Sequence, residues 1–139
     1  MSQRNLSQRS LKSIGKAKKS VIVGCLYRHP CMSVESFNND FLVPTLDKIA
    51  SEKKPLVLLG DFNIDLLNPR GNTDTDRFID IMGTYSLLPQ IILPTRITST
   101  SHTIIDNIFC SPEFTNTVSG NILTAISDHL SQFLVIQSG

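Results

Sequence analysis

The sequence has no long apolar run, few cysteines and no internal repeat, and these absences exclude several classes of protein. No apolar stretch approaches the roughly 18 residues that a membrane-spanning helix needs. The three cysteines are an odd number without Cys-x-x-Cys spacing, which argues against a disulfide framework and favours an intracellular location, nuclear or cytoplasmic. With 139 residues, 40% of them hydrophobic, the chain is predicted to bury one core.

Acidic residues are absent from the first 20 positions. That segment holds six of the 13 Lys and Arg residues, which leaves seven basic and 12 acidic residues, a net charge of −5, in the rest of the chain. We therefore expect a basic, disordered arm over residues 1–20 and a folded domain over residues 21–139. The arm is predicted to contact nucleic acid or another anionic surface, to serve as a mitochondrial transit peptide, or to be a leader without a role.

Five apolar segments are predicted to be strands. In residues 21–27, alternation places Val21, Val23, Cys25 and Tyr27 on one face of a buried strand. Residues 56–59 are apolar throughout, as expected of a strand that is covered on both faces. Three more strands are expected at 104–110, 118–123 and 133–136.

Two helices are predicted between these strands. One begins at Ser33 as its N-cap and carries apolar residues at helical spacing, with Pro44 expected to kink or split it. The other covers residues 74–82, starts with a cap at Thr73 and stops at Gly83. An exposed loop is expected at 66–73. This order of elements favours an α/β domain with a mixed sheet covered by helices.

The segment Gly60-Asp61-Phe62-Asn63 directly follows the second apolar strand. In open α/β sheets, ligands bind at the carboxyl ends of strands. Residues i and i+2 of an extended chain point the same way, so Asp61 and Asn63 are predicted to face one reacting atom. The alternative is that Asp61 only makes a turn and that Asn63 caps a loop.

A second group of polar residues lies downstream. Asp106 interrupts an apolar strand, where a charge is costly unless it is paired, and His129 of Ser127-Asp128-His129 is its predicted partner. Carboxylates, an imidazole and a divalent cation can activate water, stabilise phosphoryl oxygens and protonate a leaving oxygen. The alternatives are a solvent-facing edge strand for Asp106 and an ordinary surface loop for Asp128 and His129.

Three further side chains are candidates for phosphate contacts. Tyr27 ends its strand with a hydroxyl, although a core tyrosine is an equal alternative. Thr95 and Arg96 lie in a hydroxyl-rich loop, where Arg96 is either a phosphate clamp or a solvated side chain. A zinc site among the Cys and His residues of segment 25–31 is disfavoured, because a second ligand pair at standard spacing is missing.

Together these residues resemble the C-terminal half of the endonuclease/exonuclease/phosphatase superfamily. The specific resemblance is to the apurinic-endonuclease-like domain of LINE-type (non-LTR) retrotransposon reverse transcriptase polyproteins. The matching pieces come in the family's order over residues 21–137: Leu26-Tyr27-Arg28-His29-Pro30, Leu59-Gly60-Asp61-Phe62-Asn63, Leu93-Pro94-Thr95-Arg96, Ile105-Asp106-Asn107-Ile108-Phe109 and Ser127-Asp128-His129. The resemblance implies half of a DNase I-like, two-sheet α/β sandwich.

The resemblance also implies a reaction, which is Mg²⁺-dependent hydrolysis of a DNA phosphodiester, with Mn²⁺ as an alternative ion. The nick would leave a 3′-hydroxyl that primes reverse transcription. By this resemblance His129 contacts the scissile phosphate, and Asp106 orients the His129 ring. Asp61 handles the nucleophilic water or the leaving-group proton, with hydrogen-bonding support from Asn63. Asp128 lies by the metal. The implied substrate contacts are Tyr27, Thr95 and Arg96.

One part of the family pattern has no match in this sequence. Family members carry an N-terminal half with an Asn and a Glu that is the main metal ligand, whereas residues 1–20 hold no acid. We therefore expect about one sheet with its helices, and an exposed apolar face that binds the missing half or a second copy rather than a membrane. The alternatives are an inactive remnant that binds nucleic acid or acts as an interaction module, and a phosphatase acting on a lipid or inositol phosphate.

Overall fold

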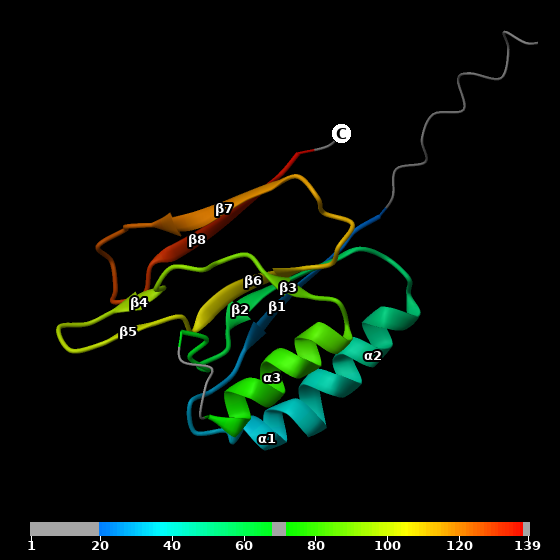
Figure 1. Cartoon of the computed structure of the whole chain (residues 1–139), viewed down its shortest axis with the longest axis horizontal. Helices are drawn as coiled ribbons and strands as arrows, with labels where there is room; N and C mark the ends of the chain where they lie inside the picture. The colour runs from blue at the N-terminus through cyan, green and yellow to red at the C-terminus, as the bar shows by residue number, and fades with distance from the viewer. Residues whose placement is uncertain (1–19, 68–71, 138–139) are drawn as a thin grey trace, which may run out of the picture.

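Four strands form the main sheet in the order β1-β2-β6-β3 (Figure 1). They are β1 (Ile22–Tyr27), β2 (Leu56–Asp61), β6 (Asp106–Cys110) and β3 (Leu88–Pro89). In this computed structural model, residues 20–67 and 72–137 are described, so residues 1–19 of the expected basic arm and residues 68–71 of the expected loop lie outside them. Strands β1 and β2 are parallel, whereas β6 is antiparallel to both β2 and β3, which confirms the predicted mixed sheet.

The first predicted helix is divided into three parts: α1 (Val34–Ser36), a π-helical segment η1 (Phe37–Leu42) and α2 (Val43–Ser51). Its start is confirmed, because the Ser33 hydroxyl accepts a hydrogen bond from the Ser36 N–H at 3.1 Å. The wider π-helical turn ends just before Pro44, which has no N–H to donate. This turn changes the phase of the helix, so that Leu42 is buried while Phe41 is 46% exposed.

The second predicted helix, α3 (Thr73–Thr84), has different ends from those expected. Its N-cap is Asn72 rather than Thr73, because the Asn72 side chain accepts a hydrogen bond from the Asp74 N–H at 3.1 Å. The helix continues through Gly83, and the chain turns away at Ser86, whose φ is 58°. In this arrangement the Ser86 N–H closes the last turn by donating to the Gly83 carbonyl at 2.9 Å.

The main core lies between the helices and one face of the sheet (Figure 1). Three phenylalanines from different elements meet at its centre, with ring centroids 5.2 to 5.9 Å apart: Phe62, Phe78 and Phe109. The helices therefore cover the sheet on one side only. Among the described residues, no helix is long and apolar enough to cross a membrane.

The predicted burial of β1 is wrong for one of its two faces. Val23, Cys25 and Tyr27 point away from the helices and are exposed, with Val23 at 67% and Tyr27 at 64%. Ile22 and Leu26 pack against the main core instead. Both alternating sets of this strand are apolar, so periodicity alone could not decide which of them faces the helices.

A second, thinner layer lies on the other side of the sheet (Figure 1). It contains the antiparallel pair β7 (Thr117–Ile122) and β8 (Ser131–Ile136), together with the short hairpin β4 (Arg96–Ile97) and β5 (His102–Thr103). A small cluster of buried residues joins the layers: Val57, Ile91, Ile108 and Cys110, with Leu59, Phe114 and Leu134 packed against it.

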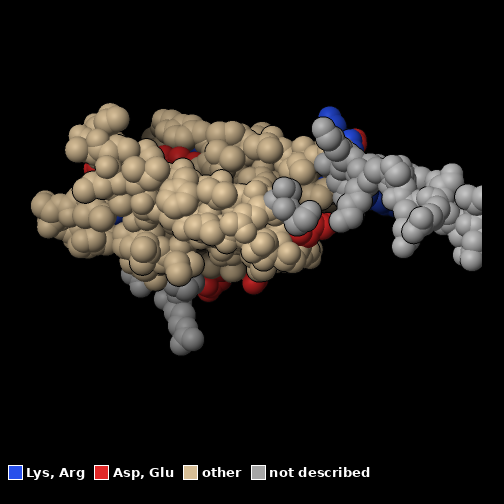
Figure 2. Space-filling view, turned by 90° about the horizontal axis from the view of Figure 1, so that it is seen from above, with Lys and Arg blue, Asp and Glu red and all other residues tan. Residues whose placement is uncertain are grey.

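The β7–β8 side of the molecule is nearly free of charge. Figure 2 looks onto this side and shows few Lys, Arg, Asp or Glu side chains on it. Over residues 114–137, Asp128 is the only residue of these four types in the sequence. Six apolar residues of this segment are exposed: Val118, Ile122, Leu123, Ile126, Val135 and Ile136. The predicted exposed apolar surface is therefore present on this layer and on β1.

Candidate active site

Strand register places three polar side chains in one row at the end of the main sheet. Tyr27 of β1 pairs with Asp61 of β2, and Asp61 pairs with Asp106 of β6. Side chains of directly paired residues point to the same face of a sheet. Because the outward residues of β1 face away from the helices, this row lies on the face that the helices leave open.

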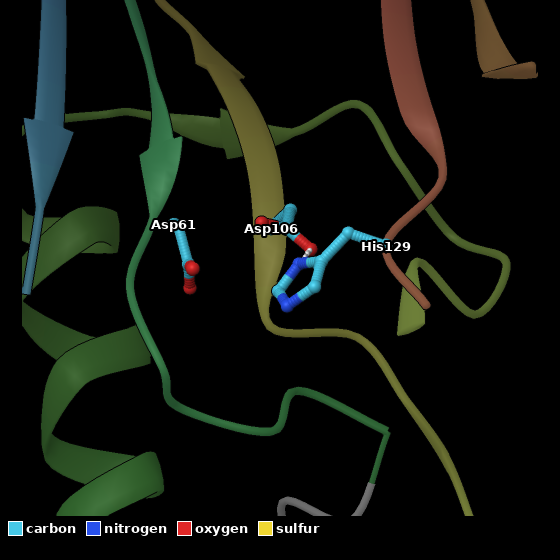
Figure 3. Close-up of side chains that lie close together, drawn as sticks. All are labelled: Asp61, Asp106 and His129. Carbon is cyan, nitrogen blue, oxygen red and sulfur yellow. Dashed lines mark hydrogen bonds and ion pairs between the residues drawn. The ribbon is translucent and has the colours of Figure 1, made fainter. Parts of the chain in front are cut away.

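Asp61 and Asp106 converge with His129, which comes from the segment just before β8 (Figure 3). One potential ligand atom from each of the three residues lies within 4.8 Å of the others. The predicted pairing of Asp106 with His129 is confirmed, because His129 Nδ1 lies 2.9 Å from Asp106 Oδ2. With the ionised carboxylate as acceptor, Nδ1 carries the proton and Nε2 is left for another partner.

Thr95 supports this pair from beneath. Its side chain is fully buried, and its Oγ1 accepts hydrogen bonds from the N–H groups of Ile105 at 3.2 Å and Asp106 at 3.1 Å. The Thr95 carbonyl also accepts a hydrogen bond from the Leu130 N–H at 2.7 Å, next to His129. The expected substrate contact of Thr95 is therefore corrected: this residue holds the backbone on both sides of the pair and presents no exposed atom.

Asp61 and Asn63 do not face one point in the way that an extended chain would place them. Asn63 has a φ of 49°, in the left-handed region, so the i, i+2 expectation fails. Its backbone N–H donates to Asp61 Oδ1 at 3.1 Å, while its side-chain Nδ2 donates to the Arg28 carbonyl at 2.7 Å. Asn63 therefore supports Asp61 through its main chain.

The pKa of Asp61 is raised above its ordinary value. Burial is the main cause, and the negative charge of Asp106 adds to it. The Asn63 N–H, followed by the positive charges of His129 and Arg96, opposes the rise. A carboxyl group whose pKa is raised toward neutrality is suited to proton transfer.

Asp128 and Arg96 form an ion pair at the edge of the site. Arg96 Nε donates to Asp128 Oδ2 at 2.6 Å, and both side chains are partly exposed. This hydrogen bond lowers the pKa of Asp128. Asp128 is thus turned toward Arg96, and the expected metal-side carboxylate is not one of the three converging groups. Arg96 remains next to the site, because its backbone bridges to His129.

The sequence did not single out Arg28, which is 5% exposed and binds the backbone of the Asp61–Asn63 segment. The only sequence signal for Arg28 was its place in the motif Leu26-Tyr27-Arg28-His29-Pro30. Its burial could not be expected, because a charged residue at the end of a strand is ordinarily solvated. Tyr27 itself is exposed, and its ring meets the edge of His29 with centroids 6.4 Å apart. Its hydroxyl is therefore free to approach a ligand on the open face.

The donor set at the site fits a hard divalent cation. Asp61 and Asp106 offer carboxylate oxygens, which Mg²⁺ and Mn²⁺ prefer, and Mg²⁺ keeps several water ligands, so few protein ligands are enough. The imidazole of His129 is engaged with Asp106 and is better placed beside such an ion than as its main ligand.

Comparison with known proteins agrees with the geometry. The sequence matches the model of the endonuclease/exonuclease/phosphatase family over residues 14–129. Among curated proteins, no significant match is found. The structure is similar to the endonuclease domain of TRAS1, a telomere-specific non-LTR retrotransposon, with a TM-score of 0.61 and 18% identity over 81% of this chain and 55% of that chain. It is also similar to an endonuclease/exonuclease/phosphatase family protein from Leptotrichia buccalis C-1013-b, with a TM-score of 0.52 and 16% identity over 82% of this chain and 49% of that chain.

These two similarities show the fold, which is the mixed α/β, DNase I-like one. The chain spans about half the length of each of these solved structures.

Proposed function

This chain belongs to the endonuclease/exonuclease/phosphatase family, and from that premise we propose that it is the C-terminal half of a LINE-type retrotransposon endonuclease domain. Its proposed reaction is metal-dependent hydrolysis of a DNA phosphodiester, with Mg²⁺ or Mn²⁺ as cofactor. The observation that carries the proposal is the convergence of Asp61, Asp106 and His129 on the open face of the sheet. Two carboxylates and an oriented imidazole are the groups that phosphodiester hydrolysis requires.

Each residue has a distinct role in this proposal. Asp106 accepts a hydrogen bond from His129 Nδ1 and so fixes the ring, and Nε2 of the doubly protonated ring would donate to a phosphoryl oxygen. Asp61, whose pKa is raised, moves a proton to or from the reacting water or the leaving oxygen. Tyr27 binds a phosphate from the same face of the sheet.

The cofactor would be held beside these groups. When bound, the cation supplies charge stabilisation at the phosphoryl oxygens. The described residues that would hold it are Asp61 and Asp106, and the family's principal metal ligand would come from the other half of the sandwich. Arg96 is available to bind a DNA phosphate when it leaves its ion pair with Asp128.

The other half of the domain is proposed to pack against the exposed apolar surface. Val23 and Cys25 point outward from β1, and the β7–β8 side of the molecule is nearly uncharged. Packing of the other half over these residues would complete the sandwich. It would also bring further groups to the row formed by Tyr27, Asp61 and Asp106. A second copy of the chain is the alternative occupant.

Nicking of supercoiled plasmid by the purified chain with Mg²⁺ or Mn²⁺ tests the proposal. We expect nicking that EDTA abolishes and that His129→Ala lowers by about 10²- to 10³-fold, the usual effect of removing one donor to a developing charge. The matched control is His102→Ala, which removes an exposed histidine of β5 and should nick like the unmodified chain. A folded sample that fails to nick with either ion, both alone and with the other half of the domain added, would contradict the proposal.

A second candidate is an inactive remnant that binds nucleic acid, favoured by the six basic residues and the absence of acidic residues in segment 1–20. It predicts DNA binding without nicking, and removal of residues 1–20 should then weaken that binding at low salt. A parallel assay with phosphoinositides separates both readings from a phosphatase, which would release phosphate and leave the plasmid intact.

A further inference from the structure

We propose that Arg28 is a positioning residue of this site. Its guanidinium joins the segment after β1 to the segment after β2, and it holds Asn63 in the left-handed conformation that directs the Asn63 N–H at Asp61. The inference deepens the proposed function and rests on it in one respect, which is that Asp61 is taken as a reacting carboxylate.

The guanidinium of Arg28 is surrounded by backbone carbonyl groups. Nε donates to the Phe62 carbonyl at 2.6 Å and Nη2 donates to the Asn63 carbonyl at 2.5 Å. On the other side, Nη1 donates to the carbonyls of His29, at 3.4 Å, and Met32. One planar side chain therefore binds two segments that are more than 30 residues apart in the sequence.

The backbone of Arg28 completes the connection. Its N–H donates to the Asp61 carbonyl at 2.9 Å, and its own carbonyl accepts a hydrogen bond from Asn63 Nδ2 at 2.7 Å. Arg28 and Asn63 thus bind each other twice, once through each side chain. A lysine could not reproduce this arrangement, because its ammonium lacks the planar fork that reaches carbonyls on both segments.

The burial of Arg28 is costly, which argues for a role beyond packing. The side chain has no ion pair among the residues that the structure describes, and its acceptors are neutral carbonyls. Burial lowers the pKa of Arg28, and the negative charges of Asp61 and Asp74 oppose this effect. A buried cation without an ion pair is rare unless its hydrogen bonds define a needed geometry.

That geometry leads directly to the reacting group. Asn63 is not a glycine, and its φ of 49° lies in the left-handed region, where its two hydrogen bonds with Arg28 hold it. In the held conformation the Asn63 N–H lies 3.1 Å from Asp61 Oδ1 and fixes the orientation of that carboxylate. Arg28 therefore acts on Asp61 through Asn63.

The first test compares Arg28→Lys with Arg77→Lys in the full chain. Arg77 is the matched control, because it is an exposed arginine on α3 whose Nη2 binds the Asn39 side chain away from the site. In Arg28→Lys we expect the Asn63 amide signal and its Cα and Cβ shifts to lose their hydrogen-bonded, left-handed values. We also expect kcat for nicking to fall by about 10- to 100-fold, with a smaller change in KM.

The second test needs no substitution and decides the matter if Arg28→Lys does not fold. A guanidinium fixed by four carbonyls rotates slowly, so the Nη protons of Arg28 should give separate NMR signals while those of Arg77 are averaged. Averaged Arg28 signals would overturn the proposal, and so would unchanged Asn63 shifts or an unchanged kcat in folded Arg28→Lys.

These readouts also separate the two proposals. If the Arg28 and Asn63 signals behave as expected but the unmodified chain does not nick DNA, the interaction stands and the nuclease function fails. If the chain nicks DNA but the signals behave otherwise, the nuclease function stands and the role of Arg28 fails.

Discussion

Replacement of Gly60 by alanine is expected to separate the two parallel strands next to the candidate site. Gly60 of β2 pairs directly with Leu26 of β1. A Cβ at Gly60 would overlap the carbonyl oxygen of Leu26 and would lie 2.8 Å from its carbonyl carbon and 3.1 Å from its nitrogen. These are backbone atoms, so no side-chain rotation relieves the overlap, and β1 has to move away from β2.

The expected cost is at the upper end of what single substitutions produce. Overpacking against flexible side chains costs about 1–3 kcal/mol, and a shift of a paired strand also weakens its hydrogen bonds, so we expect a loss of about 4 kcal/mol or more. A domain of ordinary stability has only about 5–15 kcal/mol in total. Gly60→Ala should therefore leave the chain largely unfolded or close to its unfolding midpoint at room temperature.

Gly83→Ala is the matched control, with the same change of one methyl group. Gly83 lies within α3, and a Cβ there meets no atom within 4 Å. Because alanine is the better helix former, this variant should be more stable than the unmodified chain by about 0.5–1 kcal/mol. Urea unfolding followed by circular dichroism measures both changes. A Gly60→Ala variant as stable as Gly83→Ala would refute the close approach of β1 and β2 at this position.

Three further predictions concern single side chains. Asp61→Asn should increase the free energy of unfolding at neutral pH, because the raised pKa means that ionised Asp61 opposes folding; the gain should disappear as the pH falls through that pKa. Thr95→Val should cost about 1–3 kcal/mol in urea unfolding, since two buried N–H groups lose their acceptor, whereas Thr95→Ser should retain most of the stability. The hydrogen bond to Asp47 raises the pKa of Tyr85 to about 12, so ultraviolet titration should show Tyr85 ionising near there and Asp47→Asn lowering the value.

Each of these expectations has a contrary result. The contrary result for Asp61→Asn is a free energy of unfolding that rises, relative to the unmodified chain, as the pH falls. That result would show that folding favours the ionised form of Asp61. Equal losses in Thr95→Val and Thr95→Ser would point to packing rather than to the hydroxyl. For Tyr85, the stabilising contribution should be present below about pH 10 and be lost as the pH rises through about 12, so a loss that is complete near pH 10 would exclude the bond to Asp47.

The sequence predicted one contact of the candidate site, which is the pairing of Asp106 with His129. Asp106 could be paired with His129 in advance because a carboxylate inside an apolar strand needs a partner, whatever the fold. The approximate positions of five strands along the chain and the start of the first helix also followed from local rules. These features depend on residues that are close in sequence or on a cost that one residue shows by itself.

The features that were not predicted depend on contacts between distant segments. The left-handed conformation of Asn63 and the burial of Arg28 arise together from hydrogen bonds across 35 residues. Thr95 was expected at the substrate because a hydroxyl in a loop is usually exposed, yet the chain folds back over it. The cap at Asn72 and the π-helical turn before Pro44 have a different cause, which is local. In each case neighbouring residues offer alternative ends or turns of similar free energy.

The exposure of one face of β1, which was predicted to be buried, has a functional meaning. A strand that is apolar on both faces is typical of a sheet covered on both sides, and here the helices cover only one of them. Tyr27 and Asp61 share the open face with Val23 and Cys25, and alternate residues of a strand are only about 7 Å apart. A layer that buries Val23 and Cys25 must therefore border the candidate site.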